Sequence, residues 1–260
     1  MSLTELLLNA WLALALVFTA VWWVQRRTGN AGIVDSVWAV TLGLLGPWFA
    51  WHSSAEPLVR VMLAVMPMAW GLRLGLFLWQ RNHGKPEDGR YAELRRQWGP
   101  QAAWRMWRFF QIQVLFTMVL CLGLLVASRR ESPLPDPLIL LSAFIWLASV
   151  LGEALADAQL ATFKRDPANR GRVCRQGLWG WSRHPNYFFE CLHWVAYVPL
   201  AWGTSGWWLA LFPPLVMAFL LLKLSGIPAT EAQAARSRPD YDHYIRTTSA
   251  LIPWPPKRLP

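Results

Sequence analysis

Apolar residues occur along this chain in long stretches separated by polar segments. Seven of these stretches are long enough to cross the roughly 30 Å hydrocarbon core of a bilayer as a helix. They are residues 6–24, 34–51, 58–79, 110–127, 137–156, 187–202 and 206–224. The pattern predicts an all-α polytopic membrane protein with seven transmembrane helices.

The positively charged residues predict the orientation of these helices. No basic residue precedes the first stretch, and Arg26 and Arg27 follow it directly, so we expect a retained anchor with the N-terminus outside. That choice places 21 of the 25 Lys and Arg in the cytoplasmic segments and Arg73 within a helix, and it leaves only Arg60, Arg129 and Arg130 outside. The C-terminus is then cytoplasmic, and the long basic loops face the cytoplasm.

Composition excludes several other classes of protein. Hydrophobic residues make up 55% of the chain and charged residues 15%, which is unlike a disordered chain, a collagen or an ordinary soluble domain. Cys121, Cys174 and Cys191 are too widely spaced for a disulfide framework or a thiolate metal site, and the five His show no ligand spacing. We therefore expect no metal and one membrane domain covering residues 1–260. Many of the 19 Trp lie near the ends of the stretches, and Trp179 and Trp181 can fold their basic loop onto the membrane surface.

Ionisable residues inside the predicted helices are the first functional signal, because charge at bilayer depth is costly. They all fall in the cytoplasmic half: Asp35, Arg73, Glu153, Asp157, Glu190 and His193. A set of structural ion pairs, such as Arg73 with Glu153 or Glu190, is one interpretation. The set as a whole favours a polar pocket that opens to the cytoplasm, with Gly71 and Gly75 allowing close helix packing beside Arg73.

The basic loops around this pocket predict an anionic ligand. Anionic lipid headgroups are one alternative, but the loop also contains Glu87 and Asp88, which a lipid-facing patch does not need. A phosphorylated nucleotide uses Arg for its phosphates and carboxylates for its hydroxyl or amide groups. Pro185 favours a helix start whose free N–H groups, beside Arg183, make an anion site. Sorted by loop, the charge does not indicate a nucleic-acid partner.

Four segments of the sequence resemble the steroid 5α-reductase family. The most specific block runs from Asp157 through Lys164 and Arg172 to the segment 183–190, which reads Arg-His-Pro-Asn-Tyr-Phe-Phe-Glu. The tail 241–253 is similar as well. Residues 32–38 and 87–91 resemble the bacterial branch of the family, so the resemblance covers roughly residues 30–255.

The resemblance implies a seven-helix enzyme that binds NADPH from the cytosol and reduces the C=C bond of an enone such as a 3-oxo-Δ4 steroid. It also implies a bacterial inner-membrane location, with the substrate-side helices and the first cytoplasmic loop within 1–109 and the cofactor-binding helices, loop and tail within 110–260. The candidate cofactor-binding residues are Arg73, Arg81, Asn82, Arg90, Asp157, Lys164, Arg172, Arg183, His184, Asn186, Tyr187, Glu190, Glu231 and Tyr244.

Asp35 falls where the family places a carboxylic acid near the substrate carbonyl. A carboxyl group that stays protonated can donate a hydrogen bond to the oxygen on which charge develops. The family pairs this acid with a tyrosine, whereas the matching position here is Trp70, whose indole cannot deliver a proton at neutral pH. Tyr91, another group or water then takes that role, and we assign Asp35 and Tyr91 as the catalytic candidates.

Two other classes of protein share part of this pattern. A membrane methyltransferase of the isoprenylcysteine or phospholipid type, which uses S-adenosylmethionine, also carries an Arg-His-Pro-x-Tyr segment. Its cofactor has no phosphate, so it does not explain the many basic residues. A non-enzymatic lipid- or sterol-binding membrane protein does not need the convergent charges. We therefore expect a monomeric reductase whose partners are membrane lipid and a lipid-like substrate.

Overall fold

The computed structural model describes residues 1–224 and 226–257, and Arg258, expected on the cytoplasmic side, lies outside this part. No β-strand occurs among the described residues, where Ser182 and Ser249 form an isolated parallel bridge. The chain packs as two compact units. The first contains Met1–Leu134 and Ala201–Ala210, and the second contains Pro135–Leu200 and the described residues from Leu211 onward. The functional division at 109/110 concerns roles rather than packing and stays a prediction.

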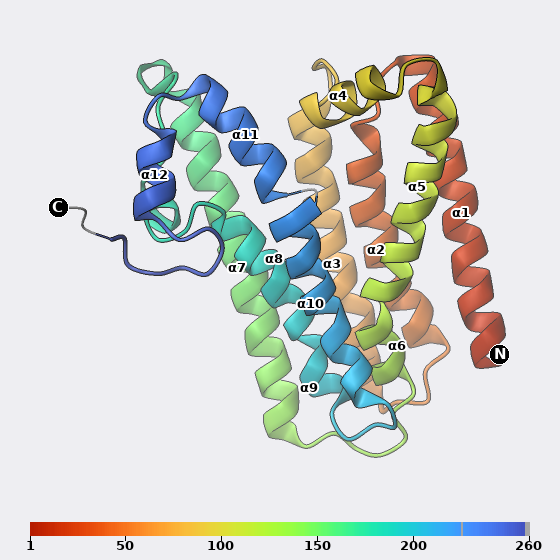
Figure 1. Ribbon diagram of the computed structural model, residues 1–260. Coiled ribbons are helices and arrows are strands. Elements are labelled where there is room, and N and C mark those ends of the chain that lie inside the picture. The colour runs from red at the N-terminus through yellow and green to blue at the C-terminus, as the bar shows by residue number, and fades with distance from the viewer. Residues whose placement is uncertain (225, 258–260) are drawn as a thin grey trace. The chain divides into compact units, whose positions relative to one another are not determined.

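The first unit consists of the helices α1 to α6. Their bounds are α1 Leu3–Thr28, α2 Ile33–Trp51, α3 Pro57–Asn82, α4 Gly89–Trp98, α5 Ala102–Leu120 and α6 Leu122–Ser128. A short 3₁₀ helix, Gly99–Gln101, precedes α5, and most of a second one, Trp207–Leu211, lies in the segment Ala201–Ala210 of this unit. Figure 1 shows α4 lying across the end of the unit where α1 ends, α2 begins and α3 ends. Most basic residues of this unit lie at that end.

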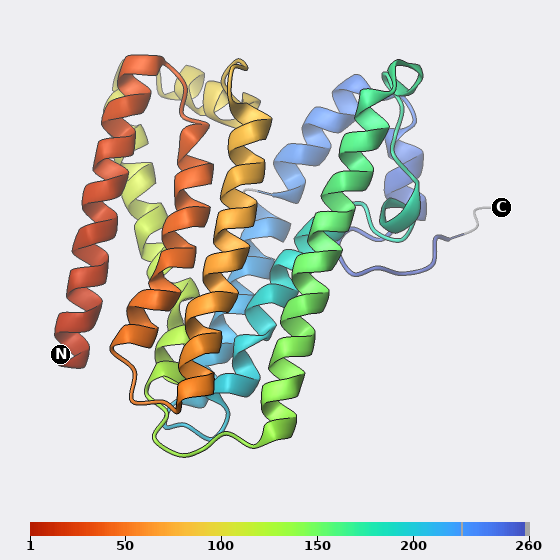
Figure 2. The same cartoon turned by 180° about the vertical axis from the view of Figure 1, so that it is seen from behind.

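Close helix packing fixes α2 against α3. A methyl group added at Gly71 would lie 2.5 Å from the Ala39 carbonyl oxygen, and one added at Gly43 would lie 2.8 Å from the Pro67 oxygen. Only glycine allows two backbones to approach this closely. Figure 2 shows these two helices side by side, and the packing expected of Gly71 is thereby found.

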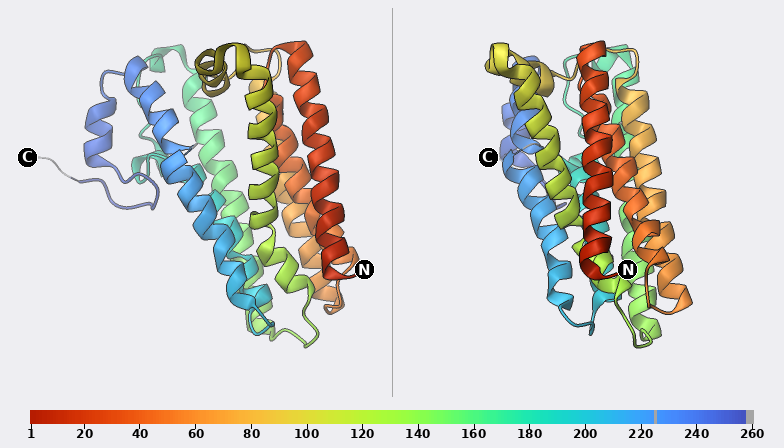
Figure 3. Two further views of the ribbon diagram at one scale, coloured as in Figure 1. Left: turned by 45° about the vertical axis from the view of Figure 1, so that its right-hand side comes forward. Right: turned by 90° about the vertical axis from the view of Figure 1, so that its right-hand side faces the viewer.

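Helix α5 packs along α1 through polar contacts of indoles. The Trp22 Nε1 group donates to the Ala103 oxygen at 2.7 Å, and the Trp107 Nε1 group donates to the Thr19 hydroxyl at 3.3 Å. Both views in Figure 3 show α5 beside α1. These contacts place the N-terminal end of α5 beside the C-terminal end of α1.

The second unit contains α7 to α12. Their bounds are α7 Asp136–Arg165, α8 Pro185–Val195, α9 Tyr197–Ala201, α10 Phe212–Phe219, α11 Ile227–Ser237 and α12 Tyr241–Thr247. The short 3₁₀ helices Pro167–Asn169 and Gly177–Gly180 lie between α7 and α8, and the π-helix Leu220–Leu224 follows α10. The serine hydroxyl of Ser142 on α7 donates to the Ala196 oxygen at 2.7 Å, which joins α7 to the break between α8 and α9.

Within the described residues, five helices are long and apolar enough to cross a membrane. A sixth span results if the bent pair Gly89–Leu120 and Leu122–Ser128, which turns by 40°, is counted as one. The expected stretch 187–202 is divided at Ala196, and the 11 residues of α8 extend only about 16 Å. The all-α membrane class is therefore supported, whereas the seventh span and the orientation in the membrane stay predictions.

Candidate functional site

The loop before α4 is fastened to the start of α2. The Asn82 side chain donates to the Gly32 oxygen at 3.3 Å, and Glu87 accepts from the Ala31 backbone N–H at 2.9 Å. Arg95 on α4 pairs with Glu87 at 2.8 Å and also donates to Gln25 on α1 at 2.9 Å. These bonds hold α4 over the N-terminal end of α2.

This arrangement brings the two catalytic candidates into direct contact. The Tyr91 hydroxyl donates to Asp35 Oδ1 at 2.5 Å, and the Arg90 guanidinium donates to Asp35 Oδ2 at 2.9 Å. Asp88 caps α4 by accepting from the Arg90 backbone N–H at 2.9 Å, and its carboxylate binds the Arg90 side chain at 3.1 Å. We call Asp35, Asp88, Arg90 and Tyr91 the α4 cluster.

In this cluster the Tyr91 phenol donates its hydrogen bond and Asp35 accepts it. Tyr91 is only 4% exposed, and α4 is a ten-residue polar helix, too short to span a membrane. Burial and the neighbouring Asp35 charge raise the pKa of Tyr91 well above its ordinary value, and Arg90 opposes this only in part. Both Asp35 oxygens accept hydrogen bonds here, whereas the sequence led us to expect Asp35 itself as the donor.

The other candidates of the first unit lie on α3. Arg81 is exposed and donates to the Asn82 side chain at 3.3 Å, and Arg73 is half-buried about two turns earlier. Trp70 is fully buried with its ring edge against Trp38, at 6.2 Å between centroids. The Asn82 side chain donates to the start of α2 beside the α4 cluster, and within the cluster Arg90 binds the carboxylates of Asp35 and Asp88.

In the second unit, Arg183 and His184 converge on one carboxylate. Arg183 Nε donates to Glu231 Oε1 at 2.7 Å, and the His184 ring nitrogen Nε2 lies 3.1 Å from the same oxygen. The remaining Arg183 donors bind the backbone oxygens of Ile245 at 2.9 Å and Thr248 at 2.5 Å. Only 9% of Arg183 is exposed, so its guanidinium fastens α11 and α12 to the start of α8.

Tyr244 adds a second fastening at the same place. Its hydroxyl donates at 2.5 Å to the Trp179 oxygen and lies 3.2 Å from the Ser182 oxygen. Desolvation by burial raises the pKa of this phenol above its ordinary value. We call Arg183, His184, Glu231 and Tyr244 the α8 cluster.

Residues of α7 and α8 also meet in the second unit. The Asn186 amide donates to Asp157 Oδ1 at 3.3 Å, and Tyr187 stacks on His184 with 5.2 Å between ring centroids. Glu190 is buried one turn after Asn186, while Lys164 is exposed in the last turn of α7. The six ionisable residues expected to converge are divided between the units, with Asp35 and Arg73 in the first. Convergence of the whole set stays a prediction.

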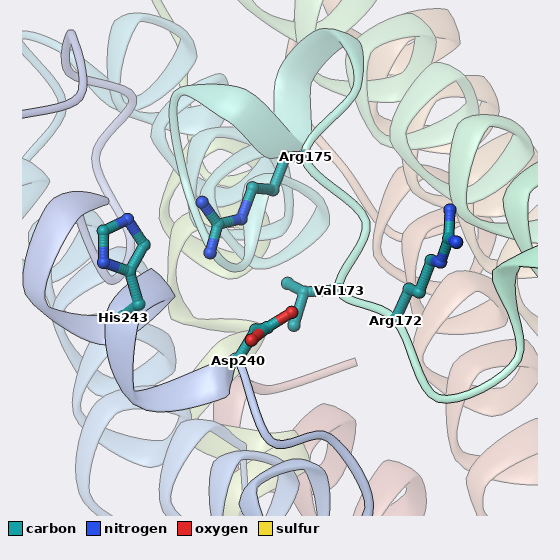
Figure 4. A pocket seen from close by; sticks show the side chains of 5 residues that line it. All are labelled: Arg172, Val173, Arg175, Asp240 and His243. Atoms are coloured by element: carbon teal, nitrogen blue, oxygen red, sulfur yellow. The ribbon is translucent and has the colours of Figure 1, made fainter.

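A basic cavity of about 570 Å³ lies between the loop before α8 and the start of α12. It is lined by Arg172, Val173, Arg175, Asp240 and His243, of which the sequence analysis named only Arg172. Figure 4 shows Arg172 and Arg175 coming from the loop, and Asp240 and His243 from the α12 side. The sequence analysis did not name Arg175 as a site residue. Its position three residues after Arg172 in the same basic loop could have indicated it.

Arg175 and His243 also line a neighbouring cavity of about 240 Å³. The Arg175 guanidinium lies 5.5 Å from the centre of the Tyr244 ring, in a cation–π contact that holds it at the wall shared by both cavities. Two guanidinium groups, which are suited to phosphate oxygens, line the larger cavity together with an imidazole and the Asp240 carboxylate. No group of three His, Cys, Asp or Glu that could hold a metal is found in the described part of the chain.

Comparison with known proteins gives a family and one curated relative. The family model described as "protein of unknown function (DUF1295)" matches residues 21–248. The 3-oxo-5-alpha-steroid 4-dehydrogenase 1 of Bos taurus is 29% identical over 86 residues, which are 33% of this chain and 34% of the relative. The match thus spans about a third of the relative's length. No solved structure matches. Because the family match extends over most of the sequence, the chain belongs to the DUF1295 family, which is steroid 5α-reductase-like.

Proposed function

We propose that this protein is an NADPH-dependent oxidoreductase that reduces the C=C bond of an enone lipid. The model substrate is a 3-oxo-Δ4 steroid, reduced to the 5α product. The observation that carries the proposal is the hydrogen bond from Tyr91 to Asp35, with Arg90 on the second carboxylate oxygen, in a member of this family. The similarity to a steroid dehydrogenase supports the class of substrate.

Enone reduction needs an acidic hydrogen at the carbonyl oxygen. When hydride reaches the β-carbon, negative charge develops on that oxygen, and a positioned donor lowers the barrier. Tyr91 holds such a hydrogen, and Asp35 orients the phenol by accepting from it. Arg90 keeps the carboxylate paired when the phenol turns toward the substrate. The proton is finally transferred to the α-carbon, so the C=C bond becomes a single bond, and water restores the proton of Tyr91.

The second unit has groups that fit a phosphorylated dinucleotide. Arg172, Arg175 and His243 surround a cavity large enough for phosphate groups, and the Asp157–Asn186 pair offers partners for amide or hydroxyl groups. NADPH, when bound, supplies the hydride. The α8 cluster holds the loop and α12, which form the walls of this cavity, in place. We further propose a monomer in the bacterial inner membrane, with these groups facing the cytoplasm.

The proposal is tested on the full chain in lipid nanodiscs with NADPH and a 3-oxo-Δ4 steroid. We expect steroid-dependent loss of NADPH absorbance and a product heavier by two hydrogen atoms in mass spectrometry. Binding of S-adenosylmethionine together with no NADPH oxidation for any enone steroid would overturn the proposal in favour of a methyltransferase.

Two variants then test which unit acts in turnover and which binds NADPH. Asp35→Asn should lower kcat at least about tenfold, which corresponds to about 1.4 kcal/mol, while NADPH affinity is kept. Glu190→Gln should weaken NADPH binding, measured by calorimetry. Asp136→Asn, an exposed residue at the start of α7, is the matched control and should change neither value. Unchanged activity in both test variants would contradict the assignment of the site.

A further inference from the structure

The last described part of the second unit is a chain segment fastened along the loop before α8. We call residues 249–257 the C-terminal strap. The Arg183 N–H donates to the Ser249 oxygen at 2.8 Å, the Trp254 N–H to the Trp181 oxygen at 2.9 Å, and the Lys257 N–H to the Thr247 oxygen at 2.8 Å. The Ser182 hydroxyl donates to the Leu251 oxygen at 2.8 Å. The backbone of the strap is therefore held along its length.

Two of the three large apolar side chains of the strap are nevertheless exposed, while Leu251 is half-buried. Trp254 is 67% exposed, Ile252 is 63% exposed, and Trp181 on the adjacent loop is 51% exposed. The backbone hydrogen bond from Trp254 to Trp181 holds these two residues next to each other. Because the backbone is held in place by hydrogen bonds, these side chains form a permanent exposed apolar surface. Such a surface indicates contact with a protein partner or with a membrane.

The loop beside the strap is held at the end of an apolar stripe on α7. The Trp179 indole donates to the Ala156 oxygen at 2.9 Å, and the Leu178 N–H donates to the Gln159 side chain at 3.0 Å. Leu155, next to Ala156, ends a series of exposed apolar side chains on α7, a helix able to cross a membrane. The other members, spaced three or four residues apart, are Leu140, Phe144, Leu147 and Leu151. The exposed surface of the strap thus lies where the lipid-facing stripe ends.

The position of the strap along α7 supports this continuity. Figures 1 and 2 show the strap at a height between the two ends of α7 and not beyond the C-terminal end, where Lys164 and Arg165 lie. The strap carries Lys257 and contains no Asp or Glu. Exposed Arg175 lies beside it, since Arg175 and Lys257 line the same cavity.

We propose that Trp181, Ile252 and Trp254 form an interfacial anchor that inserts the C-terminal strap into the headgroup layer of an anionic bilayer. Trp side chains favour this layer because the indole has an apolar body and a polar N–H. The neighbouring cations then lie beside lipid phosphates. The anchor keeps α12 and the wall of the basic cavity at the membrane surface.

The test is lipid quenching of a fluorophore on the strap. Cys121, Cys174 and Cys191 are first replaced by Ala, and Trp254→Cys is labelled with NBD in nanodiscs of anionic phospholipid. Ala168→Cys, on the exposed 3₁₀ helix after α7, is the matched control. We expect a blue-shifted emission at position 254 and severalfold stronger quenching by headgroup spin-labelled lipid than at position 168.

Three results would overturn the anchor. They are equal quenching at positions 254 and 168, a shielded fluorophore that lipid labels do not quench and so touches protein, and quenching that is the same in neutral nanodiscs. Ile252→Cys repeats the measurement if the Trp254 variant does not fold. The readout does not depend on reductase activity, so failure of the anchor and failure of the proposed function are distinguishable.

Discussion

Arg90 binds Asp35 at 2.9 Å in the first unit, and Arg183 binds Glu231 at 2.7 Å in the second. The remaining contacts of the two arginines differ. Arg90 is one-third exposed and its other hydrogen bonds go to Asp88, and the carboxylate of Asp35 also accepts from the Tyr91 hydroxyl. Arg183 is almost fully buried and binds two backbone oxygens as well as Glu231. The contacts of Arg183 with backbone oxygens fasten chain segments, whereas those of Arg90 leave Asp35 beside an O–H group, which is the arrangement that the proposed acid role of Tyr91 requires.

Removing the Tyr91 hydroxyl should have the largest effect on turnover. Tyr91→Phe keeps the ring and deletes the acidic hydrogen, and a positioned general acid contributes about 10²- to 10⁴-fold. We therefore expect kcat for enone reduction to fall by about 10²-fold or more, with NADPH affinity close to that of the parent and a melting temperature lowered by only a few degrees, because one buried hydrogen bond is lost. Steady-state kinetics and calorimetry in nanodiscs measure this separation.

Tyr241→Phe is the control for that substitution. Tyr241 is a buried tyrosine of α12 that contacts Tyr244 through its ring, with 5.8 Å between centroids. Its substitution should leave kcat unchanged. If Tyr91→Phe retains full turnover, the α4 cluster is structural and the comparison between the two arginines fails.

Truncating Arg183 should have the largest effect on stability. Arg183→Ala removes the guanidinium partner of the half-buried Glu231 and the donor to two backbone oxygens, and breaking a fully buried pair, the upper limit here, costs about 3–5 kcal/mol. We expect the melting temperature of the protein in nanodiscs to fall by on the order of 10 °C. Arg90→Ala should lower it less, because that pair is partly exposed and such pairs contribute less.

If Arg90→Ala melts at a lower temperature than Arg183→Ala, Arg90 rather than Arg183 makes the larger contribution to stability, which contradicts the comparison. Should Arg183→Ala not fold, Arg183→Lys keeps the charge and loses the forked geometry of the donors. An intermediate melting temperature for Arg183→Lys supports the fastening role, and a melting temperature equal to that of the parent contradicts it.

Hydropathy predicted the straight helices and missed the broken ones. The expected stretches 34–51 and 58–79 correspond to α2, Ile33–Trp51, and α3, Pro57–Asn82. The stretch 110–127 bends at Cys121, and the stretch 187–202 breaks at Ala196. Composition records how apolar a segment is, but the direction of the backbone at a break depends on packing that a hydropathy window does not contain.

The candidate site shows a similar limit. The resemblance indicated Asp35, and Tyr91 was named as the nearest alternative in sequence to the expected tyrosine, whose position is occupied by Trp70. The partners of Arg183 could not be predicted, because the Ile245 and Thr248 carbonyls carry no side-chain signal and become acceptors only when α12 folds back onto α8. Arg175 lies close to Arg172 in the basic loop, but the sequence could not show that it shares a cavity with His243, because that cavity forms only when α12 packs against the loop.

Acid pH should produce the smallest effect, through Asp88. Burial alone would raise the pKa of this carboxyl, but the hydrogen bond and charge of Arg90 outweigh it and hold the pKa below the ordinary 3.8. A carboxylate with a lowered pKa stabilises the fold above its unfolded-state pKa, and this contribution is lost as pH falls through the folded-state pKa. Asp88→Asn removes the charge but keeps a side chain that caps helices well. We expect the parent to melt slightly above this variant at neutral pH, the difference to start to shrink near the ordinary pKa of 3.8, and to disappear only below the lower folded-state pKa. A difference that persists in acid would show that Asp88 acts on α4 through its cap rather than through Arg90.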